Sequence, residues 1–171
     1  MNIVKSKIEN ITTFQELWSL SIDYQKNKGC PTWPKFPVEL IEKEIISENH
    51  YSIYTSDNKL CGYFSLVFND SLIWEELELN DAIYIHRMCV NQKVEKINLS
   101  SIVLEWTYTY AKKYKRKFIR MDTWGDNKQL INHYINCGYK YKRNKFIYKI
   151  PELPSHYDNI NLAMFENEVL T

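Results

Sequence analysis

Glycine is scarce in this sequence, with 4 residues in 171, and no apolar run approaches the ~18 residues that a membrane-spanning helix requires. The first residues show no signal-peptide pattern. A net charge of +1 gives no reason to expect binding to nucleic acid or to a membrane surface. No repeat or low-complexity tract divides the chain. We therefore predict one cytoplasmic domain spanning residues 1–171, with no nucleic-acid or membrane partner.

The cysteines also exclude a class of site. The chain has four, and they lie far apart without the spacing of metal ligands: Cys30, Cys61, Cys89 and Cys137. Reduced thiols and the absence of a bound metal are the simplest prediction. Aromatic residues are abundant by contrast, at 15% with 13 tyrosines, and 44% of the residues are hydrophobic. This composition predicts a globular chain with a well-packed core.

The centre of the chain reads as strand, loop, helix and strand. Ala82 to Val90 is a nearly unbroken β-branched and aromatic run, interrupted at His86 and Arg87. Apolar residues at helical spacing predict a helix from Asn98 to Tyr114, and alternation predicts a strand over Lys117–Thr123. Two strands joined through such a helix should be parallel. The loop after the first strand then meets a helix N-terminus, which favours anion binding.

The flanking segments supply further elements. Thr13 with Glu16 resembles a capping box for a helix that ends near Asn27, and Asp126 is expected to cap a helix that ends at Gly138. We read residues 69–80 as a long acidic connection. The remaining predictions are a weak first strand over 2–8, a helix over 38–47, a hairpin of strands 50–56 and 59–68, and strands over 139–150 and 160–166.

Two of these segments resemble the GCN5-related N-acetyltransferase (GNAT) family. The run Tyr-Ile-His-Arg-Met-Cys-Val at residues 84–90 resembles the central strand of that family. The family's Asn-x-x-Ala/Leu-x-x-x-Tyr-x-x-x-Gly-Phe helix is matched by Asn127, Leu130, Tyr134, Gly138 and Tyr139. The resemblance implies an α/β fold, with a mixed, mostly antiparallel sheet of about seven strands and about four helices. It also implies direct transfer of an acetyl group from acetyl-CoA, as co-substrate, to a primary amine of a small molecule.

The family's pyrophosphate loop is altered in this chain. It usually reads Arg/Gln-x-x-Gly-x-Gly/Ala, but the matching residues 95–100 are Glu-Lys-Ile-Asn-Leu-Ser, without glycine. Glycine lets backbone N–H groups approach phosphate without interference from Cβ. An inactive or weakly active GNAT-like domain that binds CoA, another ligand or a protein partner is therefore the alternative function. The resemblance assigns cofactor binding to Met88, Cys89, Val90, Lys96, Ile97, Asn98, Leu99, Ser100, Ser101 and Asn127.

Amide formation from a thioester needs a base for the ammonium proton and an acid for the departing thiolate. Tyr134 is the candidate acid, because a phenol stays protonated at neutral pH. The rival interpretation is a core tyrosine, and the family pattern favours the catalytic one. His86 is the candidate base, although a lone histidine in a buried strand is equally compatible with a core role. Glu76 is the second choice for the base.

Four residues are candidates for binding the acceptor amine. Trp33 lies in a proline-rich loop and either anchors packing or walls the pocket. Asp122 either orients the amine or caps a turn. Tyr84 matches a position where arylalkylamine acetyltransferases of the family have histidine, and Glu76 lies in the acidic connection. We expect a monomer or a homodimer.

Overall fold

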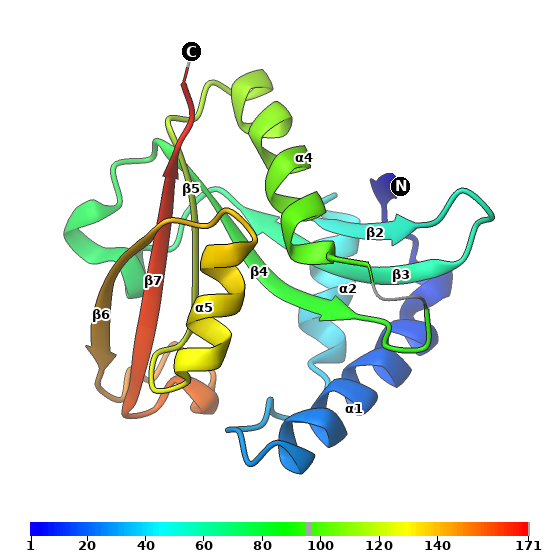
Figure 1. The fold of residues 1–171 in the computed structure, drawn as a ribbon, viewed down its shortest axis with the longest axis horizontal. Helices are drawn as coiled ribbons and strands as arrows, with labels where there is room; N and C mark the ends of the chain where they lie inside the picture. Colours follow the sequence, from blue (N-terminus) through cyan, green and yellow to red (C-terminus); the bar gives the residue numbers. More distant parts are fainter. Residues whose placement is uncertain (95–96, 171) are drawn as a thin grey trace. The chain divides into compact units, whose positions relative to one another are not determined.

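The computed structural model describes residues 1–94 and 97–170 and divides into two compact units. The first unit is formed by residues 1–66 and 86–99, and the second by residues 67–85 and 100–171. Strand β4 (Ala82–Val90) contributes its first four residues to the second unit and the rest to the first. Figure 1 colours the chain along its sequence, from blue at the N-terminus to red at the C-terminus. That residues 1–171 form one domain stays a prediction.

The first unit combines an antiparallel sheet with two helices. Strand β2 pairs antiparallel with β1 on one side and with β3 on the other. Helices α1 and α2 bury one face each, and Phe14, Trp18 and Ile41 form a cluster that also includes Cys89 of β4. The elements of this unit are β1 (Asn2–Lys5), a 3-10 turn η1 (Ile8–Asn10), α1 (Ile11–Asn27), α2 (Val38–Ile46), β2 (His50–Tyr54) and β3 (Leu60–Val67).

The second unit contains the parallel pair. Ala82–Tyr84 of β4 pairs parallel with Phe118–Arg120 of β5, and β7 pairs antiparallel with both β5 and β6. Helix α5 lies alongside β5 and β7 in Figure 1. The elements are α3 (Ser71–Trp74), the 3-10 turn η2 (Glu75–Leu77), α4 (Leu99–Lys113), β5 (Phe118–Trp124), α5 (Lys128–Asn136), β6 (Tyr141–Ile147), the 3-10 turn η3 (Ser155–Tyr157) and β7 (Ile160–Glu168).

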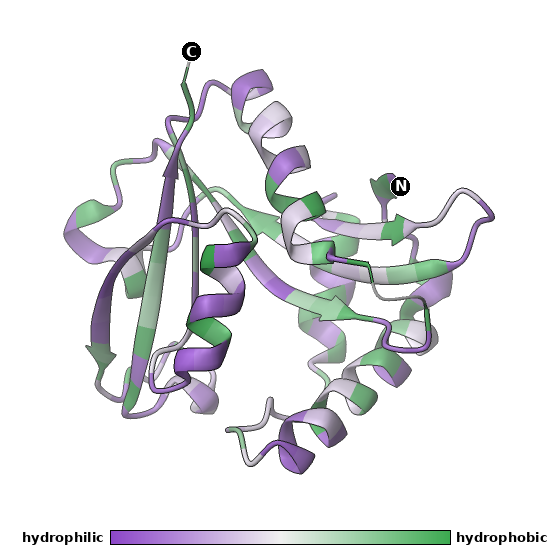
Figure 2. Ribbon diagram, in the orientation of Figure 1, coloured by the Kyte–Doolittle hydropathy of each residue, from purple (hydrophilic) through white to green (hydrophobic). Residues whose placement is uncertain are grey.

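The strand order is β1-β2-β3-β4-β5-β7-β6. This confirms the predicted α/β fold with a mixed, mostly antiparallel sheet of seven strands and a central parallel pair. The described residues contain five α-helices rather than about four, because a single turn, α3, forms within the connection before β4. Figure 2 shows helices α1 and α5 with polar and apolar residues alternating around their axes, as expected for helices with one covered face.

Three local predictions are wrong. Residues 69–80 are not merely a connection, because they form α3 and η2, and Trp74 at the end of α3 is completely buried. Thr13 and Glu16 form no capping box, since α1 begins earlier, at Ile11, and its N-cap Asn10 makes no side-chain cap hydrogen bond. Asp126 does not cap α5 either.

The cap of α5 is Asn127, whose side-chain oxygen accepts a hydrogen bond from the backbone N–H of Leu130 at 3.0 Å. The predicted end of this helix is confirmed, because Gly138 follows it with φ +98°. No helix among the described residues is long and apolar enough to cross a membrane. No disulfide joins the four cysteines, all of which are described.

Candidate active site

Tyr134 lies on α5 with its ring half-buried against aromatic neighbours. Its centroid is 5.4 Å from that of Tyr139 and 5.7 Å from that of Phe165. Burial raises the pKa of the Tyr134 phenol to about 12, and electrostatic interactions with Cys137 and Asp122 act in the same direction. The hydroxyl therefore stays protonated across the whole physiological pH range. It has the protonation state that an acid for a leaving thiolate needs.

The first turn of α4 is hydrogen-bonded to α5 and the residues after it. Ser100 is buried, and its hydroxyl oxygen lies 3.2 Å from Nε2 of His133. Its backbone oxygen accepts a hydrogen bond from the Tyr139 hydroxyl at 3.1 Å. The Ser101 hydroxyl donates to the backbone oxygen of Cys137 at 3.1 Å. The two serines that were predicted to bind the cofactor thus hold the start of α4 in place.

The other predicted residues of this loop have different environments. Lys96 lies outside the described residues. Leu99 is buried and its backbone N–H donates to the oxygen of Ile97 at 2.9 Å, whereas the Asn98 side chain is exposed. Asn127 has an established role as the cap of α5. A cofactor contact for these residues stays a prediction.

Tyr84 has no exposed surface and belongs to a buried ionic network. Its hydroxyl accepts a hydrogen bond from Nη1 of Arg120 at 2.9 Å, and the same nitrogen donates to the backbone oxygen of Leu77 at 2.8 Å. Nε of Arg120 donates to Glu166 at 2.7 Å. Burial raises the pKa of the Tyr84 phenol. This environment favours a structural role for Tyr84 over contact with an acceptor amine.

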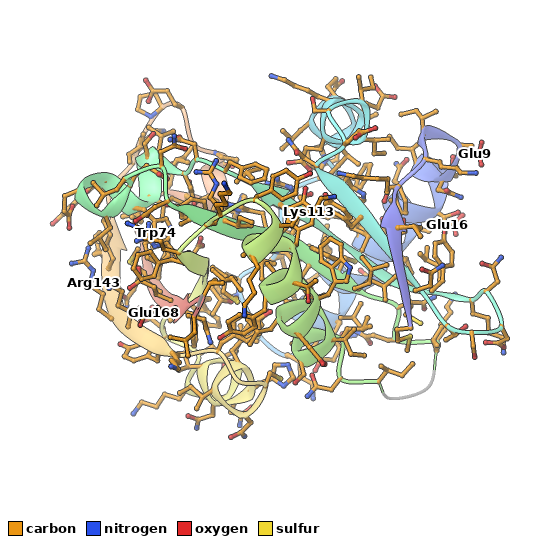
Figure 3. The ribbon with its side chains drawn as sticks, turned by 90° about the horizontal axis from the view of Figure 1, so that it is seen from above. Glu9, Glu16, Trp74, Lys113, Arg143 and Glu168 are labelled. Carbon is orange, nitrogen blue, oxygen red and sulfur yellow. The ribbon has the colours of Figure 1, made fainter. Side chains whose placement is uncertain are left out.

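Glu76 and Asp122 make polar contacts inside the second unit. Arg143 of the edge strand β6, labelled in Figure 3 with Trp74, lies 3.0 Å from the exposed carboxylate of Glu76. A hydrogen bond to its own backbone N–H, followed by the contact with Arg143, lowers the pKa of Glu76. Glu76 is therefore a weaker base than an ordinary glutamate. The Asp122 carboxylate accepts a hydrogen bond from the Tyr157 hydroxyl at 3.3 Å.

The first unit holds the second half of β4. His86 and Met88 are half-buried, whereas Val90 is partly exposed. Cys89 is buried, its sulfur lies 3.1 Å from the Ser21 hydroxyl of α1, and burial raises the pKa of its thiol. Cys89 is therefore an inert packing residue, and only its backbone is a candidate for a cofactor contact.

Trp33 lies in the loop between α1 and α2 and is anchored mainly by residues of α1. Its ring stacks on that of Trp18 with a centroid distance of 4.3 Å. Its backbone N–H donates to the Gln25 side chain at 2.8 Å, and the Trp18 indole donates to the backbone oxygen of Pro34 at 2.9 Å. Packing therefore accounts for the position of Trp33, and its exposed part is the portion available to wall a pocket.

Two features were missed by sequence reasoning. His133 contacts Ser100 and lies 3.7 Å from the sulfur of Cys137. The sequence signal available for this contact was the four-residue spacing of His133 and Cys137, which places both side chains on one helix face. Glu44 pairs with Arg87, and the signal there was a charged residue between Ile41 and Ile45 on the buried face of α2.

The comparisons with known proteins agree with this fold. No protein-family model matches the chain. An uncharacterized N-acetyltransferase of Bacillus subtilis (strain 168), YesJ, is 25% identical over 100 residues, which is 56% of this chain and 56% of that protein. A GNAT-family acetyltransferase structure from Listeria monocytogenes 4b F2365 superposes with a TM-score of 0.74 at 20% identity, covering 98% of this chain and 94% of that one.

A second similar structure includes the expected co-substrate. It is yncA from Salmonella typhimurium, solved with its cofactor acetyl-CoA, with a TM-score of 0.69 at 9% identity over 100% of this chain and 95% of that one. At these identities the likeness establishes the fold. The resemblance first seen in two sequence segments is confirmed: this chain has the fold of the GNAT acetyltransferases.

Proposed function

We propose that this chain is an N-acetyltransferase that moves the acetyl group of acetyl-CoA to a primary amine of a small molecule by direct transfer. The observation that carries the proposal is Tyr134, which stands at the tyrosine position of the family's helix and whose phenol has a pKa of about 12. Support comes from the fold shared with yncA, a protein solved with acetyl-CoA, and from the name of the YesJ relative.

The proposed reaction uses Tyr134 as the acid and His86 as the base. The acceptor nitrogen attacks the thioester carbonyl, so that a C–N bond forms as the C–S bond breaks. Before the attack, His86 accepts the proton that the ammonium group must lose, directly or through a water molecule. Tyr134 then donates its proton to the departing sulfur, and the second proton that the nitrogen loses as the amide forms restores the phenol. Tyr134 is held by α5 and His86 by β4. Backbone groups of Met88 to Val90 pair with the pantetheine, and holding both reactants supplies much of the remaining rate.

A second candidate function is a GNAT-like domain without catalysis. The observation that favours it is the glycine-free sequence of residues 95–100. The buried Ser100 adds to it, because its hydroxyl and its carbonyl are both engaged by residues of the α5 region. Such a domain would bind CoA, another ligand or a protein partner.

Two measurements together distinguish the two functions. Calorimetric titration with acetyl-CoA, CoA and dephospho-CoA measures binding, and a panel of small amines with thiol detection of released CoA measures turnover. The proposal expects acetyl-CoA to bind and at least one amine to release CoA stoichiometrically with its acetylation. Binding of CoA without turnover of any amine would favour the non-catalytic domain. Failure to bind acetyl-CoA at millimolar concentration would contradict the proposed function.

A further inference from the structure

Arg87 has a backbone conformation that strands rarely contain. Its φ is +51°, in the left-handed region, although it lies inside β4 and is not a glycine. Such a residue persists only where its surroundings hold it, because the Cβ atom disfavours this conformation. A left-handed residue also turns the peptide groups beside it out of the regular ladder of a strand. Contacts of the Arg87 side chain are one means of holding it in this conformation.

Glu44 of α2 pairs with the Arg87 side chain. Glu44 is 6% exposed, and both oxygens of its carboxylate accept hydrogen bonds from the Arg87 guanidinium. Nε of Arg87 lies 3.2 Å from Oε2, and Nη2 of Arg87 donates to Oε1. Ser65 of β3 donates to Oε2 at 2.6 Å. A two-pronged contact of this kind restricts the guanidinium in direction as well as in distance. The ion pair therefore constrains the arginine side chain, and through it the backbone of β4.

The residues that follow Arg87 are fixed as well. The backbone oxygen of Cys89 lies so close to Gly62 of β3 that a Cβ at residue 62 would be only 2.3 Å from it. The backbone N–H of Asn91 donates to the oxygen of Cys61 at 2.7 Å. Met88 to Val90 thus runs between two constrained points, the Glu44–Arg87 pair at its start and the contacts with β3 at its end.

We propose that Glu44 is a positioning residue for the acyl-CoA co-substrate. By holding Arg87 in the left-handed conformation, it aims the peptide groups of Met88 to Val90 at the pantetheine arm. The inference rests on the proposed function, because those peptide groups matter only if the chain binds acetyl-CoA.

The test compares three variants by calorimetric affinity for acetyl-CoA, thermal stability and amide exchange of residues 88–90. Glu44→Gln removes the charge that holds Arg87, and we expect the Kd to rise roughly 10- to 100-fold, the scale for small misplacements of binding groups. The double variant Glu44→Gln, Arg87→Gly places at position 87 a glycine, which adopts positive φ without strain and needs no partner to hold it. The double variant should regain most of the affinity and the exchange protection. Ser65→Ala is the matched control, because it removes a buried hydrogen bond to the same carboxylate but keeps the pair with Arg87.

The outcomes separate the two proposals. Loss of affinity in Glu44→Gln, its recovery in the double variant and wild-type affinity in Ser65→Ala would support the positioning role. Wild-type affinity in Glu44→Gln, or losses that follow thermal stability equally in all three variants, would overturn the positioning role alone. A wild-type protein that does not bind acetyl-CoA would overturn the proposed function, and the positioning role with it.

Discussion

Tyr134 permits a sharp test because phenylalanine keeps its ring and removes only the hydroxyl. The packing against Tyr139 and Phe165 would remain. We expect Tyr134→Phe to leave thermal stability and acetyl-CoA affinity nearly unchanged while kcat falls by about 10- to 10³-fold, because the lost interaction belongs chiefly to the transition state. Calorimetry and the rate of CoA release measure the two effects separately.

Tyr139→Phe is the matched control for this change. Tyr139 is 2% exposed and its hydroxyl donates to the backbone oxygen of Ser100, so its loss should cost about 1–3 kcal/mol of stability. It should lower kcat far less than Tyr134→Phe does. Equal losses of kcat in both variants would mean that packing, not proton donation, explains Tyr134.

His86 is tested by the dependence of the rate on pH. A base must be neutral to accept a proton, so activity should rise with pH on the acidic side of the profile. We expect His86→Gln to lower kcat at neutral pH roughly 10²-fold and to shift or abolish that acidic limb. An unchanged profile would leave His86 with a packing role and would direct the search to Glu76.

At the scale of elements, Gly62 keeps β3 and β4 at their observed separation. Any side chain at residue 62 would meet the backbone oxygen of Cys89, which cannot move without displacing β4. We expect Gly62→Ala to destabilise the protein by about 1–3 kcal/mol and to weaken acetyl-CoA binding. Urea unfolding and calorimetry measure the two effects.

Gly29→Ala provides the comparison, because residue 29 has φ +66° but no neighbouring atom within 4 Å of an added Cβ. It should cost only the strain of its backbone, about 1 kcal/mol, and leave acetyl-CoA affinity unchanged. A Gly62→Ala protein as stable as wild type would show that β4 can move away from β3.

Most elements were predictable because their signals are local. Periodic apolar residues define α1 and α4, and the β-branched run defines β4 within its observed bounds, Ala82–Val90. The cap of α5 shows how local reasoning fails, since Asp126 and Asn127 are both good caps. In the structure Asn127 caps the helix, whereas Asp126 accepts a hydrogen bond from Asn161.

Contacts between residues that lie far apart in the sequence were not predictable from the pattern of apolar and polar residues. Glu44 and Arg87 lie 43 positions apart, and neither residue signals the other or the positive φ of Arg87. The buried network around Arg120 and Tyr84 likewise depends on the pairing of β4 with β5. The resemblance to a family located Tyr134, but the surroundings that raise its pKa come from tertiary packing.

At the scale of the whole molecule, His50 makes the free energy of unfolding depend on pH. The side chain has no exposed surface, its Nδ1 lies 2.7 Å from the Ser6 hydroxyl, and its Nε2 is buried without a hydrogen-bond partner. Burial lowers the pKa of His50 to about 4. An unfolded chain therefore binds the proton more readily than the folded one between about pH 6.5 and pH 4, and stability falls as the pH drops through that range.

We expect the wild-type protein to lose ~2 kcal/mol of unfolding free energy between pH 7 and pH 5 through this histidine. His50→Asn retains a polar group near Ser6 but does not titrate, so its stability, although lower at pH 7, should change less over the same interval. His133→Gln is the control, because it replaces a histidine whose side chain is exposed rather than buried. Urea unfolding at pH 7, 6 and 5 compares the three proteins. A His50→Asn protein that loses as much stability as wild type between pH 7 and pH 5 would mean that other groups cause the acid sensitivity.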